Sequence, residues 1–89
     1  MKKEELYDEA IKKFGAPMQV VVCIEEMAEL AKELTKAYRG YRNNAHLAEE
    51  LADVEIMVEQ MKRYFCLELP VKFQKDKKLL RLEERIKGL

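Results

Sequence analysis

Apolar residues recur every three or four positions along most of the chain, which is the spacing of an amphipathic helix. Leu6, Ala10, Ile11 and Phe14 form the first such stripe. Almost no stretch alternates between apolar and polar residues in the two-residue period of a half-buried strand. The pattern therefore predicts an all-α chain. Four helices are expected, over residues 3–14, 17–38, 44–65 and 70–89.

Residues that favour helix ends separate these segments. Gly15 can end the first helix in a left-handed conformation, and Pro17 suits the first turn of the second, where an amide hydrogen would have no partner. Gly40 can end the second helix, and Asn43 or Asn44 can cap the third. This short connection predicts an antiparallel hairpin as the core of a four-helix arrangement.

The composition is that of one small globular domain, which we expect to span residues 1–89. Apolar residues make up 48% and charged residues 38% of the chain, unlike disordered or membrane-spanning proteins. The 17 basic and 17 acidic residues cancel, so neither a nucleic-acid polymer nor a membrane is expected as a partner. No apolar run has the length of a secretion signal, and Cys23 and Cys66 lack metal-ligand or redox spacing. We therefore expect a cytoplasmic protein with free thiols.

The segment EELADVEIMVEQM, residues 49–61, places two acids beside an apolar stripe. At about 100° per residue, six apolar residues share one arc of the third helix and predict its buried face. These residues are Leu47, Leu51, Val54, Val58, Met61 and Phe65. Glu50 lies inside the edge of this arc, and Asp53 lies just beyond Met57. A carboxylate at the margin of a core must be protonated, paired or bound to a cation, because removing an unpaired charge from water is costly.

The second helix carries a similar pair, Glu26 and Glu29, which are neighbours on one helical face. Residues equally far from the turn of an antiparallel hairpin lie side by side, and the mean position of the four acids falls within the predicted connection. We therefore expect Glu26, Glu29, Glu50 and Asp53 to meet at one level. Each pair taken alone can equally be a solvated acidic face, since like charges at this spacing cost only about 0.2 to 0.5 kcal/mol.

Four carboxylates at one level require a cation. Oxygen ligands without histidine or cysteine favour Mg²⁺, with Mn²⁺ as the alternative. A ferritin-like di-iron site needs two Glu-x-x-His units, and the single histidine, His46, does not follow a glutamate by three residues. Zinc is disfavoured because Cys23, Cys66 and His46 are scattered. We expect His46 at the surface or at the cap of the third helix.

The order Glu-x-x-Glu then Glu-x-x-Asp, with residues 30–49 between the two halves, resembles the MazG-like all-α nucleoside triphosphate pyrophosphohydrolases. The segment EELADVEIMVEQM is similar to the second motif helix of their small phage-type and bacterial members. The resemblance covers the second to fourth helices, and the first helix adds little to it.

This resemblance implies a Mg²⁺-dependent enzyme that converts a nucleoside triphosphate, ribo or deoxy, and water to the monophosphate and pyrophosphate. The implied metal ligands are Glu26, Glu29, Glu50 and Asp53. One glutamate that is not fully used as a ligand would accept the proton of the attacking water. Glu25 and Glu26 are the candidates for this general base.

Cationic side chains are expected to contact the triphosphate. On the fourth helix, Lys78, Arg81 and Arg85 line one flank of an apolar arc that we expect to face inward, similar to the Lys-x-x-Arg-Leu ending of phage-type relatives. The arc consists of Val71, Leu79, Leu82, Ile86 and Leu89. Lys32 on the second helix is a further candidate. The alternative is a solvated basic face, because cations also oppose the helix dipole near a C-terminus and pair with acids one turn away.

Apolar residues outside the main stripes indicate self-association. Val22 on the second helix, and Ala52 and Ile56 on the third, need a second buried face. The MazG-like family typically forms dimers or tetramers, so we expect a homodimer or homotetramer.

Two other functions stay open. A non-catalytic helical interaction module would contact a basic partner with its acids and receive partner helices on its spare apolar faces. A nucleotide-sensing member of the family would have lost activity, and the presence of all four acids argues against it.

Overall fold

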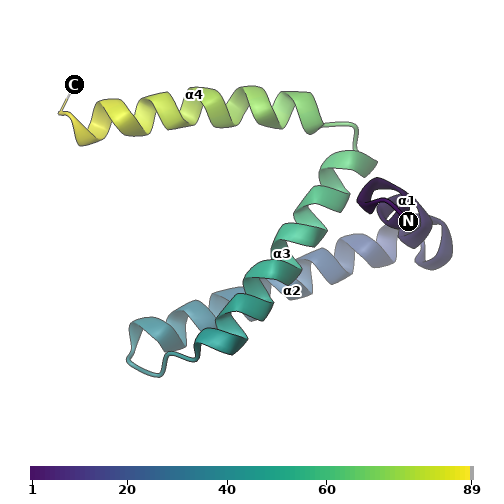
Figure 1. Ribbon diagram of the computed structural model, residues 1–89, viewed down its shortest axis with the longest axis horizontal. Coiled ribbons are helices and arrows are strands. Elements are labelled where there is room, and N and C mark those ends of the chain that lie inside the picture. The colour runs from purple at the N-terminus through teal and green to yellow at the C-terminus, as the bar shows by residue number, and fades with distance from the viewer. Residues whose placement is uncertain (89) are drawn as a thin grey trace.

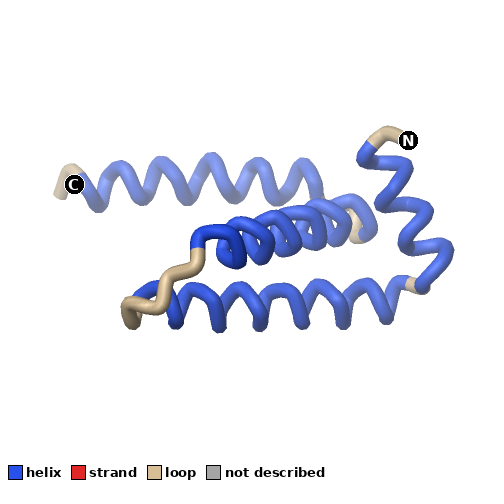
Figure 2. The backbone as a smooth tube through the Cα atoms, turned by 60° about the horizontal axis from the view of Figure 1, so that its bottom comes forward, coloured by secondary structure: helices blue, strands red, loops and turns tan. Residues whose placement is uncertain are grey.

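The computed structural model describes residues 1–88 and, within them, confirms an all-α chain. The helices are α1 (Lys3–Phe14), α2 (Ala16–Tyr38), α3 (Asn44–Tyr64) and α4 (Glu68–Ile86). The helices α2 and α3 pack against each other as an antiparallel hairpin, and α1 lies across its open end (Figure 1). From the end of α3 the chain turns back, and α4 diverges from α3 on the side away from α2 (Figures 1 and 2). Within residues 1–88, no helix combines the length and the apolar character needed to cross a bilayer.

The helix boundaries agree closely with the expected ones, except in α4. The bounds of α1 are as predicted, and α2 and α3 each differ by one residue at one end. The prediction that the last helix starts at Pro70 is wrong, because α4 starts two residues earlier, at Glu68. Proline is tolerated there since amides in the first helical turn have no partner within the helix. The predicted end at Leu89 lies outside the described residues.

Both glycine turns and the expected cap are present. Gly15 (φ 86°) and Gly40 (φ 92°) follow α1 and α2 in conformations that favour glycine. The side chain of Asn43 accepts a hydrogen bond from the backbone amide of His46 at 3.1 Å, which confirms Asn43 as the cap of α3. These local signals fix where the hairpin turns, and the turn fixes which residues of α2 and α3 face each other.

Paired polar groups attach α1 to α3. The Tyr7 hydroxyl donates a hydrogen bond to Glu59, and the Lys3 ammonium lies 3.4 Å from the same carboxylate. The Arg63 guanidinium donates two hydrogen bonds, of 2.8 and 2.9 Å, to the two oxygens of Asp8. Asp8 and Glu59 therefore each have a partner of opposite charge at this contact.

The buried core of a single chain is small. Its apolar members among the described residues are Tyr7, Cys23 and Met57. The prediction that the apolar arc of α3 forms the core is confirmed only in part. Leu47, Val54 and Met61 are half-buried, whereas Leu51 and Val58 remain 43% and 38% exposed. The reason is rotation about the helix axis: α2 packs against the neighbouring face of α3, which carries the buried Met57.

The inward orientation expected for the arc of α4 is also wrong within one chain. Among the residues that the structure describes, α4 packs against α3 alone. Leu79, Leu82 and Ile86 are exposed, and Val71, near the start of the helix, is half-buried. The apolar stripe of α4 is therefore present, but within residues 1–88 its members Leu79, Leu82 and Ile86 are left uncovered.

Candidate metal centre

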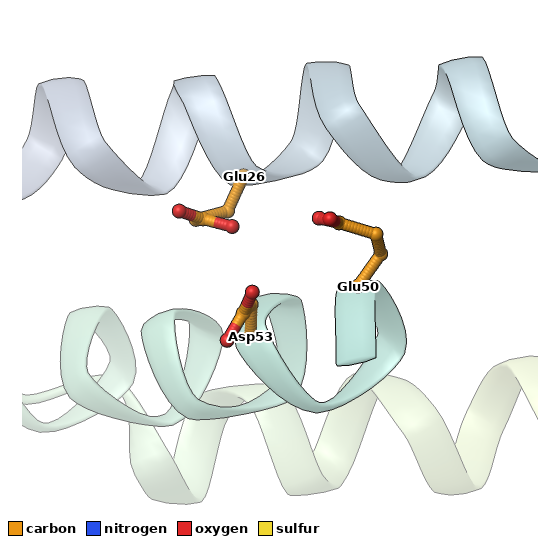
Figure 3. A group of neighbouring side chains, drawn as sticks. All are labelled: Glu26, Glu50 and Asp53. Carbon is orange, nitrogen blue, oxygen red and sulfur yellow. The ribbon is translucent and has the colours of Figure 1, made fainter. Parts of the chain in front are cut away.

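Three of the four predicted acids converge between the two hairpin helices. Glu26 comes from α2, and Glu50 and Asp53 come from the facing side of α3 (Figure 3). One carboxylate oxygen from each residue lies within 4.8 Å of the other two. Because Glu50 and Asp53 are three residues apart, they project from one face of α3, and the turn brings that face level with Glu26.

This environment makes the two glutamates harder to ionise. Burial is the largest cause raising the pKa of Glu26, and the negative charges of Asp53 and Glu50 add to it. The pKa of Glu50 is raised in the same way, first by burial and then by the charge of Asp53. Oε2 of Glu50 is buried and has no hydrogen-bond partner within residues 1–88. Both glutamates are half-buried, and Asp53 is exposed, so the group opens to solvent on one side.

The acids of this group have no basic neighbour to neutralise them. None of the ion pairs formed within the described part of the chain involves Glu26, Glu50 or Asp53. Two like charges about 4 Å apart repel by about 4 kcal/mol at an effective dielectric constant of about 20. The arrangement thus carries an unfavourable electrostatic energy that a bound cation would remove.

Glu29, the fourth predicted ligand, lies outside the converging group. Its side chain is exposed, but its charge helps to raise the pKa of Glu26 and Glu50, so it lies near them. Residues three apart on a helix differ by about 60° in direction. With Glu26 directed at α3, Glu29 is turned toward solvent at the rim.

Sequence reasoning missed Glu33 as a member of this acidic surface. Glu33 is buried, its charge raises the pKa of Glu50, and it pairs with Lys36 at 3.5 Å. The signal was present, because Glu33 follows Glu29 by four residues and Glu26 by seven, which is two turns along one face. Lys36 partly neutralises it, so Glu33 is a weaker candidate for a cation ligand.

The remaining predicted site residues are not part of the converging group. Glu25 and Lys32 are exposed on α2. Lys78, Arg81 and Arg85 are exposed on α4, and α3 separates that helix from α2 (Figures 1 and 2). The acids open between α2 and α3, so α4 of the same chain does not bring these basic residues to them (Figure 3).

The donor set fits a small hard cation. The three side chains offer carboxylate oxygens alone, which suit Mg²⁺ or Mn²⁺ better than zinc or copper. In the octahedral shell of Mg²⁺, adjacent oxygens lie about 3.0 Å apart and opposite oxygens about 4.2 Å apart. At most one pair among three ligands can be opposite, so the carboxylate oxygens, now within 4.8 Å of one another, would need to approach by up to about 2 Å. Three protein ligands would leave positions for water and phosphate oxygens.

Comparisons of the chain with protein-family models, with curated proteins and with solved structures gave no match. The resemblance to the MazG-like enzymes therefore rests on the motif residues of the sequence alone.

Proposed function

We propose that the chain is a Mg²⁺-dependent nucleoside triphosphate pyrophosphohydrolase of the MazG-like type, which acts as a homo-oligomer. The observation that supports this most is the convergence of Glu26, Glu50 and Asp53 from facing helices without a basic partner. A core that only had to be stable would not retain a half-buried Glu50 whose Oε2 is unpartnered, because its desolvation costs free energy.

The proposal assigns the four acids to the binding of the ion. Glu26, Glu50 and Asp53 would hold Mg²⁺, and Glu29 at the rim would join them by a side-chain rotation or bind through water. The bound ion would neutralise phosphate charge and lower the pKa of a bound water.

The reaction balances as a hydrolysis. A water oxygen forms a bond to the α-phosphorus, the bond from that phosphorus to the α–β bridging oxygen breaks, and pyrophosphate leaves with the bridging oxygen. A carboxylate accepts the proton of the water. Glu26 suits this role better than Glu25, because it belongs to the converging group and its second carboxylate oxygen would stay free to accept a proton while the first holds the ion.

Phosphate binding needs cations close to the acids. Lys32, one turn from Glu29 on the same helix, is the candidate within one chain. Lys78, Arg81 and Arg85 could contribute if a second copy places its α4 beside the acids.

The direct test is to incubate the pure protein with each ribo- and deoxynucleoside triphosphate and Mg²⁺, and to measure pyrophosphate and monophosphate. We expect equal amounts of both products from at least one nucleotide. A folded protein that releases neither product from any of the eight common nucleotides, with Mg²⁺ or with Mn²⁺, contradicts the proposal.

A pair of matched variants tests whether turnover depends on the acidic group. Glu50→Gln removes one ligand charge and keeps the side-chain volume, so turnover should be lost. Glu55→Gln makes the same change at an exposed position of the same helix and should leave turnover unchanged. Equal activity in both variants would separate the reaction from the acidic group.

The exposed apolar faces favour a helical interaction module as the second candidate function. Leu69, Phe73 and Ile86 on α4 are 79%, 66% and 77% exposed, as expected of a helix that binds a partner. Such a module would be indifferent to Mg²⁺, whereas the enzyme would be stabilised by it.

A further inference from the structure

A hollow of about 220 Å³ lies where α1 crosses the open end of the hairpin and meets α3 (Figure 1). Tyr7 and Ile11 line it from α1, and Gln60 and Tyr64 line it from α3. The two residues of each pair are four apart in the sequence, so each helix presents one face to the hollow. The lining therefore includes two aromatic rings and one aliphatic side chain.

The charged residues of the lining are Asp8, Lys12 and Arg63, and each already has a partner. Asp8 accepts two hydrogen bonds from Arg63, of 2.8 and 2.9 Å. The Lys12 ammonium lies 3.5 Å from the carboxylate of Glu9. These pairs leave none of the three charges for an ionic ligand, so the occupant of the hollow should be neutral.

One buried polar atom of this lining lacks a partner. Gln60 is 3% exposed, and its Oε1 is buried without a hydrogen-bond partner among residues 1–88. A buried acceptor in this state is unfavourable, because it has lost its hydration and gained nothing in return. The terminal torsion of a glutamine side chain is broad, so a small rotation directs this oxygen at a donor seated in the hollow.

The hollow is separate from the acidic group of the candidate metal centre. Gln60 follows Asp53 by seven residues, which is about 10 Å along the same face of α3. Met57 stands between them on that face and is buried. A ligand in the hollow would therefore occupy a different place from the proposed cation.

The volume and the walls of the hollow limit the ligand. Pockets for drug-sized molecules measure about 300 to 1,000 Å³. A hollow of about 220 Å³ suits one ring or two fused rings. Aromatic walls favour a flat ring, which stacks on them or meets them edge to face. The unpartnered oxygen of Gln60 requires that this ring carry an N–H donor.

We propose that the hollow between α1 and α3 binds a neutral, planar heterocycle of one or two rings, whose N–H donates a hydrogen bond to Oε1 of Gln60. The ligand contacts Tyr7 and Ile11 on one helix and Tyr64 on the other, and so holds α1 against the hairpin. These residues lie outside the acidic group, so binding does not depend on the proposed hydrolysis.

The test is a titration of the isotope-labelled full chain, followed by nitrogen–proton NMR, with indole and with benzofuran. Benzofuran has the same size as indole but an oxygen in place of the N–H. With indole we expect saturable shifts of the Gln60 side-chain amide and of the backbone amides of residues 7–12 and 60–64. The Kd should be on the order of 1 mM, as for other ligands of this size. Benzofuran should bind about two- to tenfold more weakly, because it cannot donate the hydrogen bond.

Three variants separate the hydrogen bond from the packing. Gln60→Met removes the acceptor at similar side-chain volume, so it should bind both rings equally. It should melt no lower than the wild type, because an unpartnered buried atom is lost. Gln74→Met makes the same substitution at an exposed position of α4 and should keep the preference for indole. Tyr64→Ala removes one wall and should weaken the binding of both rings by about two- to tenfold.

Several outcomes would overturn the inference. If indole causes no saturable shift at Gln60, the hollow holds water alone. Equal affinity of the wild type for both rings would mean that Oε1 of Gln60 accepts no hydrogen bond from the ligand. Shifts confined to the exposed apolar residues of α4 would mean that the rings adsorb to that helix and leave the hollow empty. If Gln60→Met unfolds, the comparison of the two rings on the wild type decides.

Discussion

The two contacts that α3 makes with α1 and with α2 differ in whether their acids are paired with opposite charges. At the contact with α1, Asp8 accepts two hydrogen bonds from Arg63. Glu59 accepts a hydrogen bond from the Tyr7 hydroxyl and forms an ion pair with Lys3. At the contact with α2, Glu26, Glu50 and Asp53 lie close together, and within residues 1–88 none of them pairs with a basic side chain. One helix therefore carries acids that fasten a neighbouring helix and acids that repel one another.

The direction of the pKa shifts separates the two groups. Hydrogen bonds from Arg63 and Tyr7 lower the pKa of Asp8 and Glu59, respectively. Burial and like charge raise the pKa of Glu26 and Glu50. Ionised acids with a lowered pKa stabilise the folded chain, and ionised acids with a raised pKa destabilise it. The second group is the one to which our proposal assigns a cation and the chemistry, because perturbed pKa values gather at functional sites.

The largest expected effect comes from removing the proposed base. Glu26→Gln should lower turnover about 10²- to 10⁴-fold, because a general base contributes about that much. Glu59→Gln makes the same substitution at the paired contact and should change turnover by less than about threefold while lowering the melting temperature. Steady-state pyrophosphate release measures both variants. If the two substitutions reduce turnover equally, the distinction between the two contacts has no catalytic meaning.

Mg²⁺ should stabilise the fold through the unpaired acids alone. At a concentration 100 times its Kd, the ion adds about 2.7 kcal/mol to the free energy of unfolding. Thermal and urea unfolding with and without Mg²⁺ measure this gain. The gain should vanish in Glu50→Gln and persist in Arg63→Gln, which disturbs the paired contact. A gain that survives Glu50→Gln would place the ion elsewhere, and no gain in the wild type would favour the interaction module.

Loss of the tyrosine hydroxyl tests the paired contact. Tyr7→Phe removes one hydrogen bond to a carboxylate and should cost about 1 to 2 kcal/mol of unfolding free energy. The remaining side chain keeps its apolar packing, so the cost should come from the hydroxyl. Burial and the charge of Glu59 raise the pKa of Tyr7 to about 12, so the effect should be constant from neutral pH to about pH 10. Urea unfolding that shows no difference between Tyr7→Phe and the wild type would mean that Glu59 is held by Lys3 alone.

The smallest expected effect is a difference in pH dependence without metal. The raised pKa of Glu26 and Glu50 means that the folded chain binds protons more tightly than the unfolded chain. Their destabilising effect is full above the raised pKa values and disappears as the pH falls to the ordinary carboxyl range. Asp8 and Glu59 behave oppositely, and their stabilising effect is lost as the pH falls through their lowered pKa values.

The comparison that isolates the first pair is between the wild type and the double variant Glu26→Gln, Glu50→Gln. Melting temperatures measured from about pH 7 toward about pH 5 should fall less steeply in the wild type, which gains stability from protonating the two acids. Parallel curves would mean that these carboxylates are not strained in the folded chain.

The helices and most of the acidic group could be predicted from the sequence. Periodicity and the signals at Gly15, Gly40 and Asn43 located the first three helices to within one residue, because each signal acts through local backbone geometry. The hairpin register then placed Glu26 level with Glu50 and Asp53, as the structure has them. The cation and the reaction remain predictions.

The sequence pattern could not predict how α3 is rotated about its axis or which helix covers each apolar face. An apolar arc predicts that one face of a helix is covered, but it does not predict which helix, or which copy of the chain, covers it. For that reason Leu51 and Val58 were expected in the core and lie on the surface, while the acidic side of α3 faces α2. The stripe of α4 is equally compatible with its own chain and with a second one. Glu33 was overlooked because its pairing with Lys36 resembled an ordinary exposed ion pair.

The short connection between Tyr38 and Asn44 has a kinetic consequence for the acidic group. The loss of chain entropy that brings Glu26 to Glu50 occurs when the hairpin forms, long before any ion arrives. In the proposed enzyme, a divalent ion would therefore meet ligands that the hairpin already holds close together, and only side-chain adjustments would remain. Its association should be governed by how fast it sheds hydration water, so Mn²⁺, which exchanges water faster than Mg²⁺, should enter sooner.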